Sequence, residues 1–440
     1  MHLHTEVSDA EIPRILNAFI GITGVKEWKR RLVWLNKQLT ANEFLRDYTA
    51  QIYALELEVG RVLEEIKSTG RIDLRSTTVD RYRLFAFITA VVSIYARLSP
   101  KGQKRLRGMI LGGLRDGGLT PLQQEMGVAA HLFSRGFDVF FSDIETGSGF
   151  DFLATKDSIE IEVECKRVGL SLGRKIPRLD VLNLHKYIHA QVKPLFGKLN
   201  RGLLLRVILP GRLTSNVPAH EAIAAAVRKA CLSGVACATS HCDVEQFEFQ
   251  IEGTPFEQAT GQSDMPSIRA YIEKRFNVKN REIFVLGEKG KRALAVSVES
   301  RQPDTLIESL FADLKASADR QFSKTRPGLL CVQFIDLTNE QIRRMGTASN
   351  GESPGTPSYI LRETSMFLAS PSRSHIRSMV FRGRGDVGQS ASIRDGFLTH
   401  EIQEEGSAFF VTNDTHPLAA DRRYAIFGDE FPRSRILVDS

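Results

Sequence analysis

The stretch from Gly149 to Arg167, GFDFLATKDSIEIEVECKR, contains two apolar segments joined by a polar turn. From Ile159 to Lys166, apolar and charged residues alternate strictly, which is the period of a β-strand with one buried face. The Lys156-Asp157-Ser158 run between the segments is typical of a hairpin turn. We therefore expect two adjacent strands, with Glu164 and Lys166 side by side on the polar face of the second.

Asp151 stands at the start of the first strand, so its carboxylate can meet that of Glu164 on the neighbouring strand. Two adjacent carboxylates repel each other and are costly to desolvate unless a divalent cation lies between them. Lys166, next to that pair, could orient or deprotonate an attacking water and offset negative charge on a phosphate. The alternative is an exposed strand face of mixed charges, whose cross-strand pairs stabilise the sheet only weakly.

The spacing of Asp151, Glu164 and Lys166 resembles the motif of the PD-(D/E)XK nuclease superfamily, the restriction-endonuclease-like fold, in which an Asp is followed on the next strand by Glu-x-Lys. The resemblance covers residues 118–212. Phe150 stands where the nominal motif has proline. The resemblance implies that Asp151 and Glu164 bind Mg²⁺ (or Mn²⁺) and that Lys166 is catalytic.

Glu125 is a further candidate for the same site. Residues 120–136 predict a helix whose apolar face includes Leu122, Met126 and Ala129, and Glu125 falls on that face. A carboxylate in an apolar stripe is uncommon unless it is paired or bound to a cation. The alternative is a side chain at the edge of the stripe that reaches water. In the superfamily a glutamate of the preceding helix often joins the metal site, which implies a catalytic, metal-binding role for Glu125.

The order of the expected elements also agrees with the resemblance. After the helix we expect a strand at 137–145, the two motif strands, a helix at 180–199 and an apolar strand at 202–209. We expect an α/β (α+β) protein with a restriction-endonuclease-like core and a mixed central sheet at 118–245. An N-terminal helical domain at 1–116 and a C-terminal α/β domain at 246–440 would flank it.

Positive charge follows the motif directly. Eleven Lys or Arg residues and a single acid, Asp180, lie between residues 166 and 212, although the whole chain has a net charge of only +7. Phosphate contacts need such a surface and are independent of base sequence. The candidate nucleic-acid-binding residues are Lys166, Arg167, Arg174, Lys175, Arg178, Lys186 and Lys193.

Composition indicates the compartment in which the protein is expected to occur. No run approaches the roughly 18–20 apolar residues of a membrane span, so no membrane association is expected. Five cysteines, odd in number and irregularly placed, favour free thiols and a cytoplasmic protein.

Residues 292–336 repeat the layout of the motif region, with Glu299-Ser-Arg301 at the end of a strand, then a helix and the strand GLLCVQFID. One interpretation is a degenerate, inactive repeat of the core, and the other is the common strand–helix–strand pattern of α/β domains. Arginine in place of lysine stays protonated and cannot act as a base.

These observations predict a metal-dependent endonuclease, a hydrolase of phosphodiester bonds. The resemblance favours DNA over RNA as substrate, and a role in antiviral genome defence or DNA processing in bacteria. A nucleic-acid-binding protein that keeps the nuclease fold without cleavage is the alternative, and a structural subunit of a larger assembly is a third. The sequence does not decide whether the protein forms a homodimer or binds a partner protein.

Overall fold

The computed structural model describes most of the chain. The described residues are 6–8, 11–70, 72, 78–147, 149–169, 171–257, 265–277, 282–347, 358–384, 387–394, 397–404, 407–424, 426 and 433–437. The chain divides into two compact units. The main unit consists of Met1–Lys37, Thr49–Gly169 and Ile307–Ser440, and the inserted unit of Gln38–Tyr48 and Leu170–Leu306. Both units combine helices with a mixed sheet, so the α+β fold class is confirmed.

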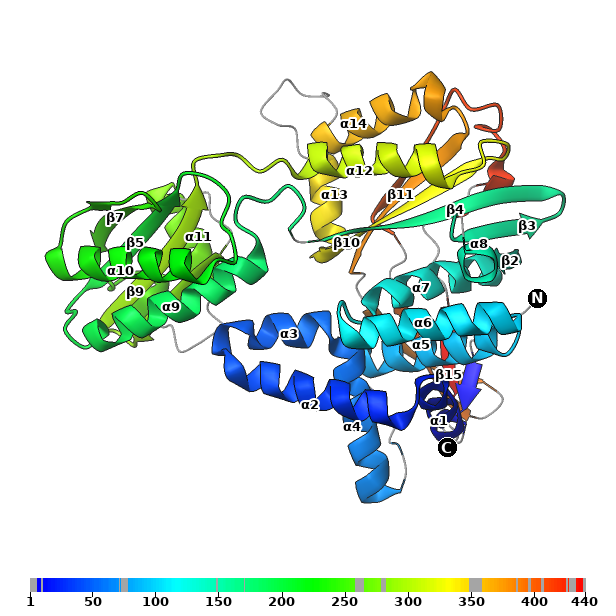
Figure 1. Cartoon of the computed structure of the whole chain (residues 1–440), viewed down its shortest axis with the longest axis horizontal. Coiled ribbons are helices and arrows are strands. Elements are labelled where there is room, and N and C mark those ends of the chain that lie inside the picture. Colours follow the sequence, from blue (N-terminus) through cyan, green and yellow to red (C-terminus); the bar gives the residue numbers. More distant parts are fainter. Residues whose placement is uncertain are drawn as a thin grey trace. The chain divides into compact units, whose positions relative to one another are not determined.

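A six-stranded sheet is the centre of the main unit (Figure 1). Its order is β14 (Phe409–Thr412), β11 (Ile376–Arg384), β10 (Gly328–Thr338), β4 (Ile159–Val168), β3 (Phe152–Lys156) and β2 (Asp138–Phe141). Strands β4, β10 and β11 run parallel, whereas β2, β3 and β14 add antiparallel edges. The sheet is therefore assembled from segments on both sides of the inserted unit.

The expected hairpin is confirmed. Strands β3 and β4 pair antiparallel, with Phe152 opposite Val163. Asp157 and Ser158 in the turn both have positive φ, 46° and 66°. Consecutive residues of this kind match the right-handed twist of the flanking strands. The preceding strand is shorter than expected, because β2 ends at Phe141 and a short helix, α8 (Ser142–Thr146), follows.

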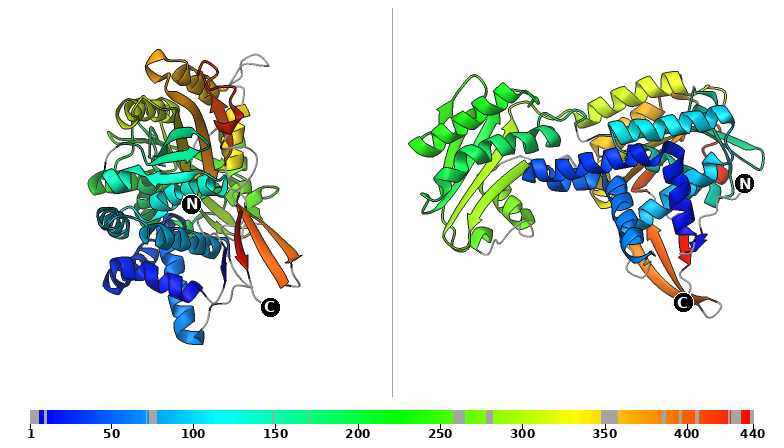
Figure 2. Two further views of the ribbon diagram at one scale, coloured as in Figure 1. Left: turned by 90° about the vertical axis from the view of Figure 1, so that its right-hand side faces the viewer. Right: turned by 60° about the horizontal axis from the view of Figure 1, so that its bottom comes forward.

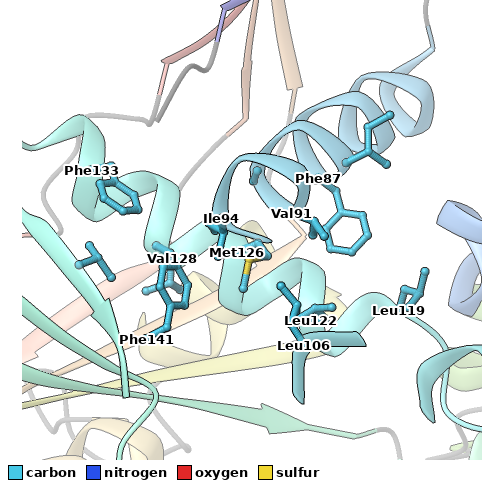
Figure 3. Packing of buried hydrophobic residues seen from close by; sticks show 14 of the residues in the cluster. Phe87, Val91, Ile94, Leu106, Leu119, Leu122, Met126, Val128, Phe133 and Phe141 are labelled. Carbon is cyan, nitrogen blue, oxygen red and sulfur yellow. The ribbon is translucent and has the colours of Figure 1, made fainter. Parts of the chain in front are cut away.

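One continuous hydrophobic core joins the N-terminal helices to one face of this sheet. Its helices are α1 (Ile12–Thr23), α4 (Ala54–Thr69), α5 (Val79–Tyr95), α6 (Pro100–Arg115) and α7 (Thr120–Ser134). Figure 3 shows side chains of α5, α6, α7 and β2 in this core. Residues 1–116 therefore do not form the separate helical domain that was expected. Phe87 and Val91 of α5 share one hydrophobic core with Met126 and Val128 of α7.

The other face of the sheet is covered by helices α12 (Leu306–Gln321) and α14 (Tyr359–Leu368), with α13 (Asn339–Thr347) beside them (Figure 1). Glu162 and Glu164 on this face are 0% and 1% exposed. The expectation of a half-buried β4 is therefore wrong for Glu162 and Glu164, although Glu160 on the same face stays exposed. The sequence pattern indicated a polar face, but the segment that follows α12 contacts it, with Ser323 and Arg326 bound to Glu162.

The inserted unit has its own five-stranded sheet, in the order β6 (Cys237–Ala238), β7 (Asp243–Phe249), β5 (Gly202–Leu209), β9 (Arg292–Ser300) and β8 (Glu282–Glu288). Its helices are α9 (Arg178–Phe196), α10 (Val217–Ser233) and α11 (Met265–Phe276). Helices α2 (Val25–Ala41) and α3 (Arg46–Ile52) each have residues in both units.

Two expectations about chain order are corrected here. The helix at 180–199 and the strand at 202–209 form, but β5 pairs with β7 and β9 in the inserted unit and not with β4. The bounds 118–245 and 246–440 therefore differ from the two units that form. Residues 292–336 are not a second copy of the core, because β9 lies in one sheet whereas α12 and β10 belong to the main unit.

A small sheet joins the two ends of the chain. Its order is β1 (Glu6–Ser8), β15 (Arg433–Leu437), β13 (Phe397–Glu404) and β12 (Val387–Arg394), with β1 and β15 parallel. In Figure 2 the blue β1 and the red β15 lie together beside the orange strands.

Candidate active site

Asp151 and Glu164 come together at one end of the β3–β4 hairpin, as the spacing predicted. Asp151 directly precedes β3, and its Oδ2 accepts a hydrogen bond of 2.6 Å from the backbone N–H of Cys165. That contact places the Asp151 carboxyl against β4, one residue from Glu164. The carboxylate pair is therefore produced by the register of a tight hairpin.

Glu164 is buried and makes one strong contact. Its Oε1 lies 2.5 Å from Nζ of Lys166, the next residue along the same face of β4. Its Oε2 is shielded from solvent and has no hydrogen-bond partner among the described residues. An unpaired carboxylate oxygen is unfavourable when buried. The backbone N–H of Asp151 also acts on this carboxyl and lowers its pKa, and the Oε2 atom is a candidate ligand atom for a cation.

The structure also brings Glu125 to this cluster. Burial raises the pKa of Glu125 to about 8, with further contributions from the negative charges of Asp151, Asp143 and Glu164. Lys166 acts in the opposite direction. Glu125 lies in the second turn of α7 and reaches the cluster from there.

The other two carboxyl groups are shifted in the same direction. Burial raises the pKa of Asp151 to about 6, against the Cys165 N–H bond and the charge of Lys166, which both lower it. Burial and the Asp151 charge raise the pKa of Glu164 to about 7. Three carboxyl groups with raised pKa values in one place are the pattern of a functional site more often than of a structural ion pair.

The donor chemistry of this cluster fits a hard divalent cation such as Mg²⁺, which takes oxygen ligands from one or two carboxylates and keeps several waters. The Oε2 of Glu164, which lacks a hydrogen-bond partner among the described residues, is one oxygen that could serve as such a ligand. In the part of the chain that the structure describes, no group of three or more His, Cys, Asp or Glu side chains is arranged to enclose an ion directly. A cation could still bind here and offset the repulsion between the carboxyl groups if water molecules supplied the remaining ligands of its coordination shell.

A small cavity of about 30 Å³ borders this cluster. It is lined by Glu125 and Gln124 of α7 and by Lys166 of β4, and also by Gln333 of β10 and Arg382 of β11. The sequence reasoning missed Gln333 and Arg382. Each is a polar residue that interrupts an apolar strand, in GLLCVQFID and in MVFRG, and that interruption is the signal that could have found them.

The candidate nucleic-acid-binding residues are divided between the two units. Lys166 and Arg167 lie near the end of β4 in the main unit, whereas the other five belong to the inserted unit. Two of those five are in ion pairs: Arg174 lies 3.4 Å from Asp304 and Arg178 lies 3.3 Å from Glu282. The backbone N–H of Lys175 donates to Asp304, whereas Lys186 and Lys193 are exposed on α9.

Comparison with models of known protein families, with curated proteins and with solved structures finds no match for this chain. Within the described residues, the helices are all too short or too polar to cross a lipid bilayer. All five cysteines are free, as their number and spacing predicted.

Proposed function

We propose that this protein is a metal-dependent nuclease that hydrolyses phosphodiester bonds in DNA. The single observation that carries the proposal is the cluster of Glu125, Asp151 and Glu164, whose carboxyl groups have raised pKa values, with Lys166 in contact with Glu164. A structural role does not explain the cluster, because buried carboxyls that repel one another lower the stability of the fold. A bound cation would offset this cost.

The topology of the main unit supports the proposal independently. Helix α7, strands β2, β3 and β4, helix α12 and strand β10 come in this order once the inserted unit is passed over, with the short helix α8 between β2 and β3. This helix, three strands, helix, strand order is the one that the resemblance to restriction-endonuclease-like nucleases implies. In this arrangement β10, and not β5, is the strand beside β4.

Each side chain has a distinct role in the proposed reaction. Asp151 and Glu164 would hold Mg²⁺ or Mn²⁺, and Glu125 would hold it directly or through water. The ion, when bound, would supply positive charge at the scissile phosphate. Lys166, fixed by its 2.5 Å contact with Glu164, would position the attacking water and stabilise negative charge that develops on the phosphate. The preference for DNA over RNA as substrate, and a role in genome defence or DNA processing, are proposed from the resemblance alone.

One assay tests the proposal. Purified protein is incubated with supercoiled plasmid, linear duplex and RNA, each with Mg²⁺, with Mn²⁺ and with EDTA. An Asp151→Asn variant, which keeps the shape of the side chain, is purified in parallel to detect a contaminating nuclease. Cutting that requires the metal and is lost in the variant supports the proposal. Retention of nucleic acid without cutting would instead identify a binding protein. A protein that neither cuts nor retains nucleic acid would be a structural subunit.

A further inference from the structure

A second, larger cavity adjoins the candidate active site in the main unit. It measures about 390 Å³, whereas the cavity bordered by Glu125 and Lys166 measures about 30 Å³. The two cavities share three lining residues, Gln124, Gln333 and Arg382. A ligand in the larger cavity would therefore lie next to the carboxylate cluster.

The residues shared by the two cavities come from β10 and β11, which contribute Gln333 and Arg382, and from α7, which contributes Gln124. Arg167 of β4 is the register partner of Gln333 of β10, and Gln333 is the register partner of Arg382 of β11. These residues lie toward the carboxyl ends of their strands, the end of a parallel α/β sheet where ligands bind. Gln333 and Arg382 line both cavities, whereas Arg167 lines only the smaller one.

Arg382 is poised for an anion. Its Nε and Nη1 are shielded from solvent and have no hydrogen-bond partner in the described part of the chain. Buried donors without an acceptor are costly, and an arriving acceptor relieves that cost. The planar guanidinium matches the two oxygens of a phosphate better than it matches a single acceptor. Arg382 is thus a candidate ligand for an anionic group with two oxygens, such as the phosphate of a bound strand.

The rest of the larger cavity suits a nucleobase. Apolar residues of α5, among them Phe85, Ala86 and Phe87, form part of its lining, and the flat face of a base can pack against such an apolar wall. Gln123 and Gln124 contribute amide groups, which can both donate to and accept from the edge of a base. A volume of about 390 Å³ accommodates one nucleotide and excludes a duplex.

We propose that this cavity receives a single unstacked nucleotide of the substrate strand and that Arg382 binds the phosphate of that nucleotide. The inference rests on the proposed nuclease function and specifies which class of nucleic-acid substrate the protein would prefer. The protein would then prefer strands that present an unpaired nucleotide, at a single-stranded end, a gap or an extruded base, because extraction from a duplex costs stacking and pairing energy.

Gly127 on α7 is a position from which a side chain can be added to the cavity. It lines the larger cavity, and a Cβ added to it would meet no atom within 4 Å. Gly127→Leu therefore places a side chain in the space that the base would occupy. Gly112→Leu on α6 is the matched control, because Gly112 is also helical and open to a Cβ but is exposed outside the cavity. Both changes favour the helix.

Binding is measured in EDTA, so that no turnover is needed. The probes are inorganic phosphate, a nucleoside 5′-monophosphate, a single-stranded oligonucleotide and a fully paired duplex. We expect the nucleotide to bind at least about tenfold more tightly than phosphate, a difference of about 1.4 kcal/mol. Gly127→Leu should abolish that preference and weaken single-strand binding about tenfold, whereas Gly112→Leu should match the wild type. Arg382→Ala should weaken binding of both phosphate and nucleotide, and Arg344→Ala, an exposed arginine of α13, should not.

Two results would overturn the assignment. Equal affinity for phosphate and nucleotide would mean that no base enters the cavity. Loss of free-nucleotide binding in Gly127→Leu with unchanged strand binding would mean that the cavity takes a free nucleotide instead. The nuclease proposal is tested separately. A wild-type protein that binds nucleotide but never cuts would refute the nuclease activity and leave the cavity assignment intact. Conversely, unchanged cutting of gapped DNA by Gly127→Leu would refute the cavity assignment alone.

Discussion

Ser323 donates two hydrogen bonds to the buried carboxylate of Glu162, from its backbone N–H at 2.8 Å and from its hydroxyl at 2.5 Å, across 161 residues of chain. Arg326 adds an ion pair to the same carboxylate at 3.4 Å. The backbone N–H of Glu162 in turn donates to Pro327 O at 2.9 Å. These contacts fix the segment between α12 and β10 on β4, so the sheet closes correctly after the inserted unit.

We predict that Glu162→Ala lowers the free energy of unfolding of the full chain by about 2–4 kcal/mol, because it leaves the Ser323 donors without their acceptor and removes the buried one of the two carboxylates that pair with Arg326. Urea unfolding followed by circular dichroism measures the loss. Glu160→Ala is the control: the Glu160 side chain is 51% exposed and pairs with the same arginine, so its loss should cost less than about 1 kcal/mol. Equal costs would show that the buried contacts do not anchor the strand.

A second prediction concerns the chemistry. Lys166→Ala should reduce metal-dependent cleavage by at least about a hundredfold while leaving metal binding nearly intact, because it removes the group that positions water or stabilises charge. Asp151→Ala should lose both cleavage and metal affinity. Cleavage of labelled duplex and titration with Mn²⁺ separate the two effects.

Lys104→Ala, at an exposed position on α6, serves as the control and should cleave as the wild type does. Wild-type turnover in both Lys166→Ala and Asp151→Ala would place the chemistry elsewhere in the molecule.

The raised pKa of Glu125, about 8 against its usual 4.5, predicts how stability depends on pH without metal. The folded protein holds the Glu125 proton more tightly than the unfolded chain does, so this group destabilises the fold as pH rises through that interval. Glu125→Gln removes the titrating group. We expect it to raise the free energy of unfolding by roughly 1–3 kcal/mol near pH 9 and to change it little near pH 5.

Urea unfolding in EDTA at both pH values tests this expectation, with Glu64→Gln, an exposed residue of α4, as the control. Added Mg²⁺ should stabilise the wild type more at the higher pH, because a metal ion binds ionised carboxylates. Stabilisation by Glu125→Gln that is equal at both pH values would show that its charge is not the cause.

The local parts of this fold were predictable from the sequence. Strict alternation and the turn at Asp157 and Ser158 fixed the register that unites Asp151 with Glu164, since a hairpin is specified by neighbouring residues. Glu125 was found because a carboxylate in an apolar stripe needs a partner. These signals lie within a few tens of residues of one another.

The long-range part was not predictable in the same way. GLLLRVILP at 202–210 and GLLCVQFID at 328–336 are both a glycine followed by an apolar strand, and either could pair with β4 on local grounds. The choice depends on contacts such as that of Ser323 with Glu162, which no periodicity encodes. Gln333 and Arg382 were missed for this reason, because they join the site only through the pairing of β10 with β4 and β11.

The basic segment after the motif now divides into exposed and paired residues. Replacing Lys186 and Lys193 with Ala should weaken binding of all nucleic-acid sequences alike and reduce the log–log salt slope by up to about 2, because each phosphate contact contributes about 0.9. Fluorescence anisotropy over a range of salt concentrations measures the slope. A loss of affinity for one sequence only would indicate base recognition.

Arg178→Ala should act differently, through stability. Burial raises the pKa of Glu282, and the charges of Arg178 and Arg269 oppose that rise. Removing Arg178 leaves Glu282 less well paired, so we expect a lower urea midpoint for the inserted unit. A drop in nucleic-acid affinity at unchanged stability would instead assign Arg178 to the binding surface.

The last prediction concerns Glu299 and Arg301, whose Glu-x-Arg layout resembles that of Glu164 and Lys166. Both have structural partners in the inserted unit, since Glu299 pairs with Arg206 and Arg301 pairs with Asp243. Glu299→Gln with Arg301→Ala should therefore leave metal-dependent cleavage within about threefold of wild type, less than 1 kcal/mol in activation free energy. It should lower stability, because Arg206 loses its most buried carboxylate partner. Lys166→Ala, assayed beside it, sets the scale of a catalytic loss. A loss as deep as that of Lys166→Ala, in a double variant still folded by circular dichroism, would move the chemistry from the main unit to the inserted one.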